Sequence, residues 1–117
     1  MRHEESDTQC ACVRWFRLQY PEFYSLLFAV PNGGARNLRE GARLKREGVV
    51  AGVADLILLM PRGGFHALCI EMKTDEGHQS KEQKAWQKAV EEQGVKYVIC
   101  RSFDDFYSIV TNYISVS

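Results

Sequence analysis

Two carboxylates and one amine lie at the ends of two apolar segments that read as strands. Asp55 opens the segment 55–60, and Glu71 and Lys73 lie at the end of the segment 66–72. A hairpin connection at 61–65 would place Asp55 directly opposite Glu71, with Cβ atoms about 4.5–5.5 Å apart. Lys73 follows Glu71 by two positions, so strand alternation places it on the same face. The spacing therefore gathers two acids and a lysine at one point.

The chemistry of such a set is metal-assisted hydrolysis. Two carboxylates this close repel each other unless a cation lies between them or one keeps its proton. Oxygen ligands favour Mg²⁺, or Mn²⁺ in its place, over zinc. Water held by the ion can attack a phosphodiester, and a nearby lysine can orient that water or stabilise the developing charge. The alternative is an ion pair at the strand ends with no catalytic role.

The cysteines and the apolar segments exclude other classes of protein. Cys10 and Cys12 lie in a helical pattern, Cys69 and Cys100 lie in apolar segments, and no pair of CxxC motifs appears. Buried free thiols in a reducing compartment are a better interpretation than zinc ligands. The N-terminus is polar, and no apolar segment approaches the roughly 20 residues of a membrane span. We expect a cytoplasmic protein with no membrane partner.

The elements that must position these residues alternate between helical and strand-like patterns. Apolar residues recur at helical spacing up to Tyr20, and Pro21 ends that helix. Ser80 and Gln83 have the spacing of a capping box, and Gly94 lies where a C-terminal cap belongs. In chain order we expect a helix at 6–20, a strand at 24–30, a charged helical or partly mobile segment at 36–47, strands at 55–60 and 66–72, a helix from 80, a strand at 95–100 and a helix from 102.

This order predicts one α/β domain spanning residues 1–117. The strands carry apolar residues at both parities, as a sheet covered on both faces requires, so helices should lie on both sides. The apolar content of 45% and the charged content of 26% are ordinary for a globular domain. A formal net charge of zero argues against a wholly basic protein but allows a locally basic face.

The motifs taken together resemble a known family of nucleases. "GVADL" at 52–56 and "IEMK" at 70–73 are similar to the PD-(D/E)xK superfamily. The wider ordered set resembles the stand-alone VRR-Nuc family; it comprises Glu5 with Gln9, "VRWFR" at 13–17, "PNGG" at 31–34 followed by Arg36, and "SKEQKAWQ" at 80–87. The resemblance implies a mixed central sheet flanked by helices with a restriction-endonuclease-like core. Ala54 stands where the family usually has proline.

The same resemblance implies roles for individual residues. Asp55, Glu71, Lys73 and Gln83 would be catalytic, and Glu5 would complete a magnesium site with Asp55 and Glu71. From pattern alone, Glu5 is also a first-turn acid favoured by the helix dipole. However, the apolar row of the helix, extended backwards in steps of four, passes through Gln9 and reaches Glu5. The neighbouring Glu4 is not on that row. Gln83 could equally serve only the capping box.

A basic stretch follows the Pro-Asn-Gly-Gly turn and is the candidate DNA contact. Arg36, Arg39 and Arg43, with Asn32 in the turn, could contact phosphates through guanidinium groups and backbone donors. A solvated helix face is the ordinary explanation for such a charge run.

Together these features predict a Mg²⁺-dependent endodeoxyribonuclease. The resemblance suggests branched DNA as the partner, with resolution of Holliday junctions by a homodimer, because two symmetric cuts need two catalytic sets. No nucleotide cofactor is expected. The alternatives are a flap or duplex nuclease and a DNA-binding module that keeps the fold without turnover.

Overall fold

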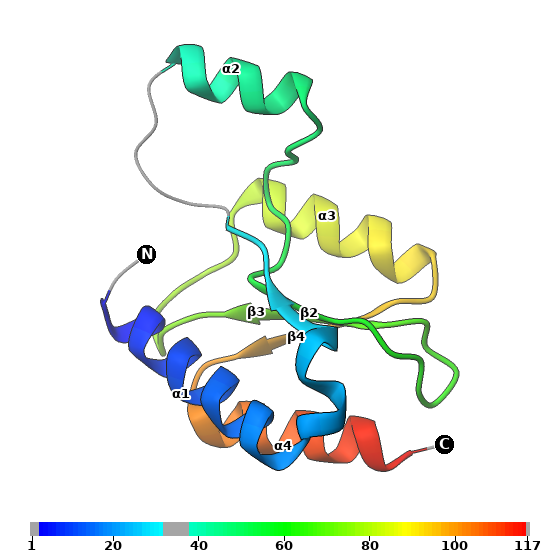
Figure 1. Cartoon of the computed structure of the whole chain (residues 1–117). Coiled ribbons are helices and arrows are strands. Elements are labelled where there is room, and N and C mark those ends of the chain that lie inside the picture. The colour runs from blue at the N-terminus through cyan, green and yellow to red at the C-terminus, as the bar shows by residue number, and fades with distance from the viewer. Residues whose placement is uncertain (1–2, 32–37, 117) are drawn as a thin grey trace.

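A four-stranded mixed sheet runs through the middle of the molecule (Figure 1). The computed structural model describes residues 3–31 and 38–116. The strand order follows the sequence, β1-β2-β3-β4. The first two pairings are antiparallel and the pairing of β3 with β4 is parallel. The bounds are Leu27–Ala29 for β1, Leu56–Leu58 for β2, Leu68–Met72 for β3 and Lys96–Cys100 for β4.

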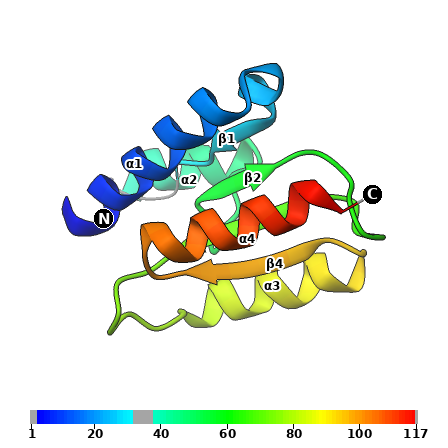
Figure 2. The same ribbon diagram turned by 90° about the horizontal axis from the view of Figure 1, so that it is seen from below.

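Helices cover both faces of the sheet, as its apolar strands predict (Figures 1 and 2). Helices α1 (His3–Gln19) and α4 (Phe103–Ser115) pack on one face, and α3 (Lys81–Glu92) lies on the other. The larger core lies under α1 and α4, where Phe16 and Phe106 are fully buried. A smaller core under α3 joins Cys69 and Tyr97 to Trp86. The strand β3 lies between β2 and β4, and every one of its residues is buried.

The predicted hairpin register is confirmed. Leu56 pairs with Ile70 and Leu58 pairs with Leu68. Counting one residue beyond the first pair sets Asp55 across from Glu71. The hairpin turn is closed by a bridge between residues 62 and 65 and by two glycines with positive φ. The length of the turn favours this register. The apolar pattern does so too, because a slip of one residue would turn the apolar side chains to the wrong face.

The predicted helix caps are also confirmed. Ser80 Oγ accepts from the Gln83 backbone N–H at 3.1 Å, and Gln83 Oε1 accepts from the Ser80 N–H at 2.8 Å. Ser102 Oγ accepts from the Asp105 N–H at 3.1 Å and opens α4. Gly94 follows the C-cap residue Gln93 of α3 and has a φ of 80°. These side chains bond to backbone groups that a helix end leaves unpaired.

The prediction of a strand at 24–30 is wrong in its first half. Residues Pro21–Leu26 form a 3-10 helix, η1, and only Leu27–Ala29 form a strand. Pro21 suits the first position of a helical turn because its φ is already fixed near the helical value. Phe23 packs against the core, and the guanidinium of Arg17 lies 4.4 Å from the centroid of the Tyr24 ring. The segment Pro21–Leu26 therefore forms helical turns, although its apolar residues suit a strand equally well.

The charged segment contains a short helix, α2 (Leu38–Arg46), that stands off the body of the molecule (Figure 1). None of the side chains described in it is buried.

Among the residues that the structure describes, no helix is long and apolar enough to span a membrane.

Candidate active site

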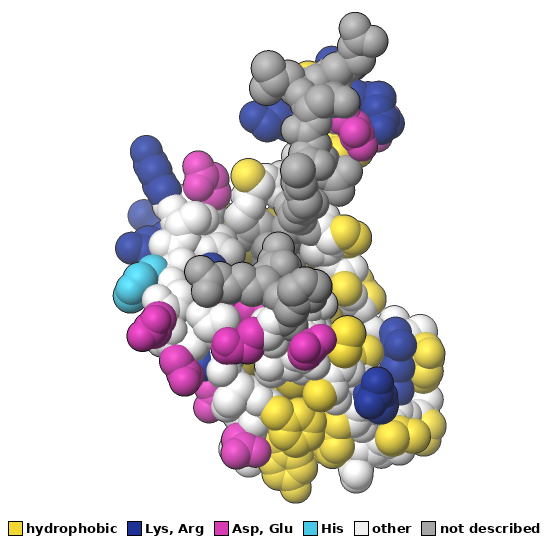
Figure 3. All heavy atoms as spheres, turned by 90° about the vertical axis from the view of Figure 1, so that its left-hand side faces the viewer, with side chains coloured by type: hydrophobic (Ala, Val, Ile, Leu, Met, Phe, Trp, Pro, Cys, Tyr) yellow, Lys and Arg dark blue, Asp and Glu magenta, His cyan; other side chains and the backbone are white. Residues whose placement is uncertain are grey.

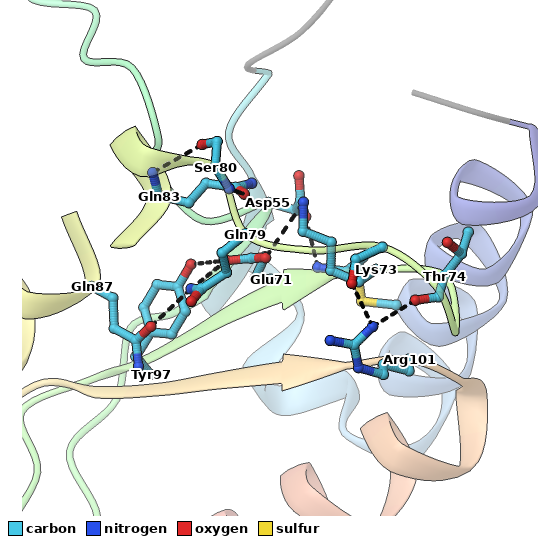
Figure 4. A network of polar contacts seen from close by, with 12 residues as sticks. Asp55, Glu71, Lys73, Thr74, Gln79, Ser80, Gln83, Gln87, Tyr97 and Arg101 are labelled. Carbon is cyan, nitrogen blue, oxygen red and sulfur yellow. Dashed lines mark hydrogen bonds and ion pairs between the residues drawn. The ribbon is translucent and has the colours of Figure 1, made fainter. Parts of the chain in front are cut away.

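Asp55 and Glu71 lie at the ends of adjacent strands on the sheet face toward α3 (Figure 4). Asp55 precedes β2, and its Oδ2 accepts a hydrogen bond from the Met72 backbone N–H at 2.7 Å. Glu71 lies within β3 and is the one fully buried charged residue among the described side chains. A buried carboxylate is costly unless hydrogen bonds or a cation compensate it. The surroundings of Glu71 therefore indicate what the site is built to hold.

The two oxygens of Glu71 have different surroundings. Oε1 accepts hydrogen bonds from the Tyr97 hydroxyl and from Gln79 Nε2, the latter at 3.1 Å. Oε2 lies 3.6 Å from Lys73 Nζ and has no hydrogen-bond partner among the described residues. Burial raises the pKa of Tyr97, and the bond to Glu71 raises it further, so the phenol keeps its proton. Glu71 thus has one oxygen held by neutral donors and one beside a lysine.

The electrostatics of Asp55 bring the predicted set together. Burial is the main cause that raises the pKa of Asp55, and the Met72 N–H opposes it. The charges of Glu71 and Glu5 raise the pKa further, and Lys73 lowers it. All three are therefore within electrostatic range of Asp55. A site in which two acids raise the pKa of Asp55 and one lysine lowers it is one that a cation would stabilise.

Glu5 reaches the rim of this site. It is half-buried near the start of α1, whereas Glu4 is exposed, which agrees with the choice of Glu5 from the helical stripe. Both line a cavity of about 520 Å³ whose opposite wall is the loop 74–77. Within residues 3–31 and 38–116, no three His, Cys, Asp or Glu side chains are close enough together to hold a metal ion as a group. The structure brings Glu5 near the strand acids but does not bring it into contact with them.

The strand acids themselves fit a hard divalent cation. Their donor atoms are carboxylate oxygens, which Mg²⁺ and Mn²⁺ prefer. Glu71 Oε2 is buried without a hydrogen-bond partner among the described residues, although buried polar atoms normally have one. Asp55 and Glu71 would supply two ligands, and the shared edge of the sheet would fix their separation.

Gln83 lies at the N-terminus of α3, with its carbonyl oxygen bonded to the Ser80 N–H (Figure 4). Sequence reasoning missed two other residues of this face, Gln79 and Tyr97. Gln79 directly precedes the capping residue, and Tyr97 pairs in β4 with Cys69, two positions before Glu71. The parity of Tyr97 in its strand could have placed it on the face of Glu71, had the parallel register been known.

Two contacts outside the acids hold the loops of the site. The Arg101 guanidinium donates through Nη1 to the carbonyl oxygens of Thr74 at 2.7 Å, Gly77 at 2.8 Å and Asp75 at 3.3 Å (Figure 4). These hydrogen bonds fix the loop that follows Lys73. Gly52 has a φ of 88°, and a Cβ there would lie 2.4 Å from the Glu82 carbonyl carbon. The chain before Asp55 therefore packs directly on the backbone of α3.

The predicted phosphate contacts are not brought to the site by the described residues. Asn32 and Arg36 lie outside the described residues, and Arg39 is in α2 with its side chain outside them. Arg43 is exposed on α2, and its Nη1 lies 3.0 Å from Glu47 Oε2. Figure 3 shows acidic side chains gathered across the face of the molecule below, with the basic side chains of α2 at its top. The positive charge of α2 therefore lies at the edge of this acidic face.

Comparison with known proteins identifies this arrangement. A solved structure described as a "VRR_NUC domain protein" superimposes with a TM-score of 0.86 at 26% sequence identity. The match covers 100% of this chain and 93% of that chain. A search of curated protein sequences found no match. The sequence-family model of the VRR-NUC domain matches residues 1–104, which is most of the chain. The family resemblance of the motifs and the predicted fold are both confirmed, and the chain belongs to the VRR-NUC domain family.

Proposed function

We propose that this protein is a metal-dependent endodeoxyribonuclease that hydrolyses phosphodiester bonds in structured DNA. Membership of the VRR-NUC domain family supports a nuclease role with DNA as the substrate. The observation that carries the proposal is the buried carboxylate of Glu71, whose Oε2 has a lysine at 3.6 Å and an acid on the neighbouring strand. A purely structural ion pair has no need of the second acid.

Asp55 and Glu71 hold the divalent ion in this proposal, with Glu5 as a third ligand from α1. Mg²⁺ is the expected cofactor and Mn²⁺ its substitute. When bound, the ion supplies Lewis acidity toward the scissile phosphate and orients the water that attacks it. Two observations favour Glu5 for this role: it lines the cavity at the rim, and its charge raises the pKa of Asp55.

Lys73 acts on the phosphate and its nucleophile. Its side chain is mostly buried and its ammonium group lies 3.6 Å from Glu71 Oε2, so it brings a positive charge into the site. There it can orient a water molecule or stabilise negative charge that develops on the phosphate oxygens. Gln83 contributes through the amide nitrogen, because its carbonyl oxygen is used by the cap of α3.

The basic residues of α2 supply the contacts with the DNA backbone. The acidic face of the site would repel a polyanion, so positive charge from outside it is required. Arg43, Lys45 and Arg46 lie in the last turn of α2. Arg39, Arg36 and Asn32 extend the same stretch toward the turn at 31–34. None of these contacts needs to distinguish one base from another.

The preferred substrate in this proposal is a four-way DNA junction cut by a homodimer. One catalytic set cuts one strand, and a twofold dimer would supply the two symmetric cuts. Leu18 and Tyr24 are 78% and 52% exposed, so this side of α1 and η1 offers apolar surface to a second copy. A flap or duplex nuclease would use the same catalytic residues.

A panel of end-labelled DNA tests the proposal. Linear duplex, flap, splayed arm and four-way junction are each incubated with the protein in Mg²⁺, in Mn²⁺ and in EDTA. We expect cleavage in Mg²⁺ or in Mn²⁺, and none in EDTA. In the four-way junction, we expect paired symmetric nicks. Asp55→Asn and Glu71→Gln should both be inactive. Cleavage that persists in EDTA would reject the metal dependence, and binding without cleavage of any substrate would favour a non-catalytic DNA-binding module.

A further inference from the structure

Glu71 receives two hydrogen bonds on one oxygen and none on the other. The Tyr97 hydroxyl and Gln79 Nε2 both donate to Oε1, while Oε2 is the atom nearest to Lys73 (Figure 4). Neither donor carries a charge, so neither neutralises Glu71. What these donors do is restrain the rotation of the carboxylate.

Each donor is itself held in place. The Tyr97 ring packs edge-on against Trp86, with centroids 6.1 Å apart, in the small core under α3. Gln79 Nε2 also donates to Gln87 Oε1 at 2.8 Å, and Gln87 Nε2 donates to Glu91 Oε2 at 3.1 Å. Glu91 can only accept, so it sets the direction of both amides along the chain. Gln79 therefore has to present a donor to Glu71.

We propose that Tyr97 and Gln79 are positioning residues that make Glu71 a one-oxygen metal ligand through Oε2. This inference rests on the proposed function. A carboxylate can bind a cation through one oxygen or through both, and two donors on Oε1 leave Oε2 as the free one. Partners behind a metal ligand orient it, and their loss typically lowers metal affinity 10- to 100-fold.

The consequence is a change in metal affinity that depends on two residues outside the motifs. Tyr97→Phe removes one donor and keeps the ring against Trp86. Gln79→Leu removes the other and also disconnects Gln87. Each variant should bind Mn²⁺ about tenfold more weakly, and the double variant more weakly still. Cleavage at saturating metal should fall less than the metal affinity does, because Asp55, Glu71 and Lys73 remain.

The test is titration calorimetry of Mn²⁺ into the full chain without DNA, with wild type, both single variants and the double variant. Tyr113→Phe is the matched control. Its hydroxyl is also buried and donates to the Met60 carbonyl at 2.7 Å, and it lies against the hairpin connection at the far end of the sheet. The control should be less stable than wild type, because it loses a buried hydrogen bond. It should keep the Mn²⁺ affinity of wild type.

The outcomes separate this inference from the proposed function. Wild-type affinity in Tyr97→Phe and in Gln79→Leu, with binding lost in Asp55→Asn, would overturn the positioning role and leave the nuclease proposal standing. A wild-type chain that binds no Mn²⁺ would overturn both. An equal loss of affinity in Tyr113→Phe would show that general destabilisation is the cause and would also overturn the positioning role. If Tyr97→Phe fails to fold, Gln79→Leu, at a half-buried position just before α3, decides the matter alone.

Discussion

The Asp55 carboxylate accepts a hydrogen bond from the backbone N–H of Met72, with 2.7 Å between Oδ2 and N. This contact joins the start of β2 to the end of β3 and holds Asp55 beside Glu71. Since Met72 is the residue after Glu71, the strand pairing that orders the sheet also orders the acids. Backbone geometry therefore sets the positions of the two proposed ligands, and the cost is repulsion between them in the absence of a cation.

Asp55→Asn should make the metal-free protein more stable and remove its response to metal. Asparagine Oδ1 can still accept from the Met72 N–H, while the buried charge is gone. In the wild type the pKa of Asp55 is raised in the folded state, so its ionisation destabilises that state as pH rises above the ordinary value of 3.8. In EDTA, the advantage of the variant in unfolding free energy should grow from pH 4 to pH 7.

Added Mn²⁺ should reverse that ranking. A ligand at 100 times its Kd stabilises the protein that binds it by about 2.7 kcal/mol, and the variant should gain much less. Urea unfolding with and without metal measures both effects. A variant that is less stable than wild type in EDTA at every pH would contradict the repulsion.

Lys73→Met should abolish turnover and also destabilise the protein in EDTA. Glu71 is fully buried and Lys73 is its cationic neighbour, so removal of the ammonium leaves a buried charge without a counter-charge. Breaking such a pair costs about 3 kcal/mol. Saturating Mn²⁺ should recover part of the loss, because the ion would take over as the counter-charge. Lys88→Met, on the exposed side of α3, is the control and should change neither property.

Gly52→Ala should disturb the site from outside it. A Cβ at Gly52 would lie 2.4 Å from the Glu82 carbonyl and 2.8 Å from the Gln83 backbone nitrogen, and the φ of 88° is itself unfavourable for alanine. Backbone atoms of α3 cannot rotate away, so the chain leading to Asp55 must shift. We expect a loss of about 3 kcal/mol in unfolding free energy with strongly reduced cleavage. Gly48→Ala has a φ of 107° but open space around it, and should show the conformational cost alone.

Neutralising the last turn of α2 should weaken DNA binding without changing its sequence preference. Each phosphate contact contributes about −0.9 to the slope of log affinity against log salt for duplex DNA. Arg46→Ala and Lys45→Ala should each flatten the slope by roughly one unit if each contacts a phosphate. Lys96→Ala is a control, because this lysine is at the start of β4, away from α2, where its ammonium lies over the Phe65 ring. An unchanged slope in both α2 variants would assign them to an ordinary solvated surface.

Thiol reactivity should report the packing of the sheet. Cys10 is exposed, whereas Cys12, Cys69 and Cys100 are buried. Burial raises the pKa of Cys12 and of Cys100 to about 12 and that of Cys69 to about 11, so the reactive thiolate is scarce at neutral pH. A thiol reagent should label Cys10 first, and the other three only on unfolding. Rapid labelling of Cys100 in the native state would contradict the packing of α1 and α4 on the sheet.

The parts of this fold that follow local rules could be predicted from the sequence. The hairpin register depends on a short turn and on alternation, and Ser80 with Gln83 forms a cap by spacing alone. The segment after Pro21 could not be predicted as well, because a run of apolar residues fits a strand and a partly buried 3-10 turn equally. What decides between them is the contact of Phe23 with the core, and that contact comes from the tertiary fold.

The candidate site divides in the same way. Asp55, Glu71 and Lys73 could be predicted because their spacing along two strands is regular. Tyr97 could not, because its place beside Glu71 depends on the parallel pairing of β3 with β4 across a whole helix. Gln79 precedes its helix and looks like a linker residue in the sequence. Only the fold brings its amide to the buried carboxylate.

The separation of α2 from the body has a consequence for hydrogen exchange. Its nine residues are fewer than an isolated helix needs for stability in water, and none of its described side chains is buried. Its amide protons should therefore exchange through local opening at a small free energy, while those of β3 exchange only when the whole domain unfolds. Binding of DNA along α2 would slow exchange there first. Part of the binding free energy would then be used to order this helix, so its intrinsic helicity becomes a determinant of affinity.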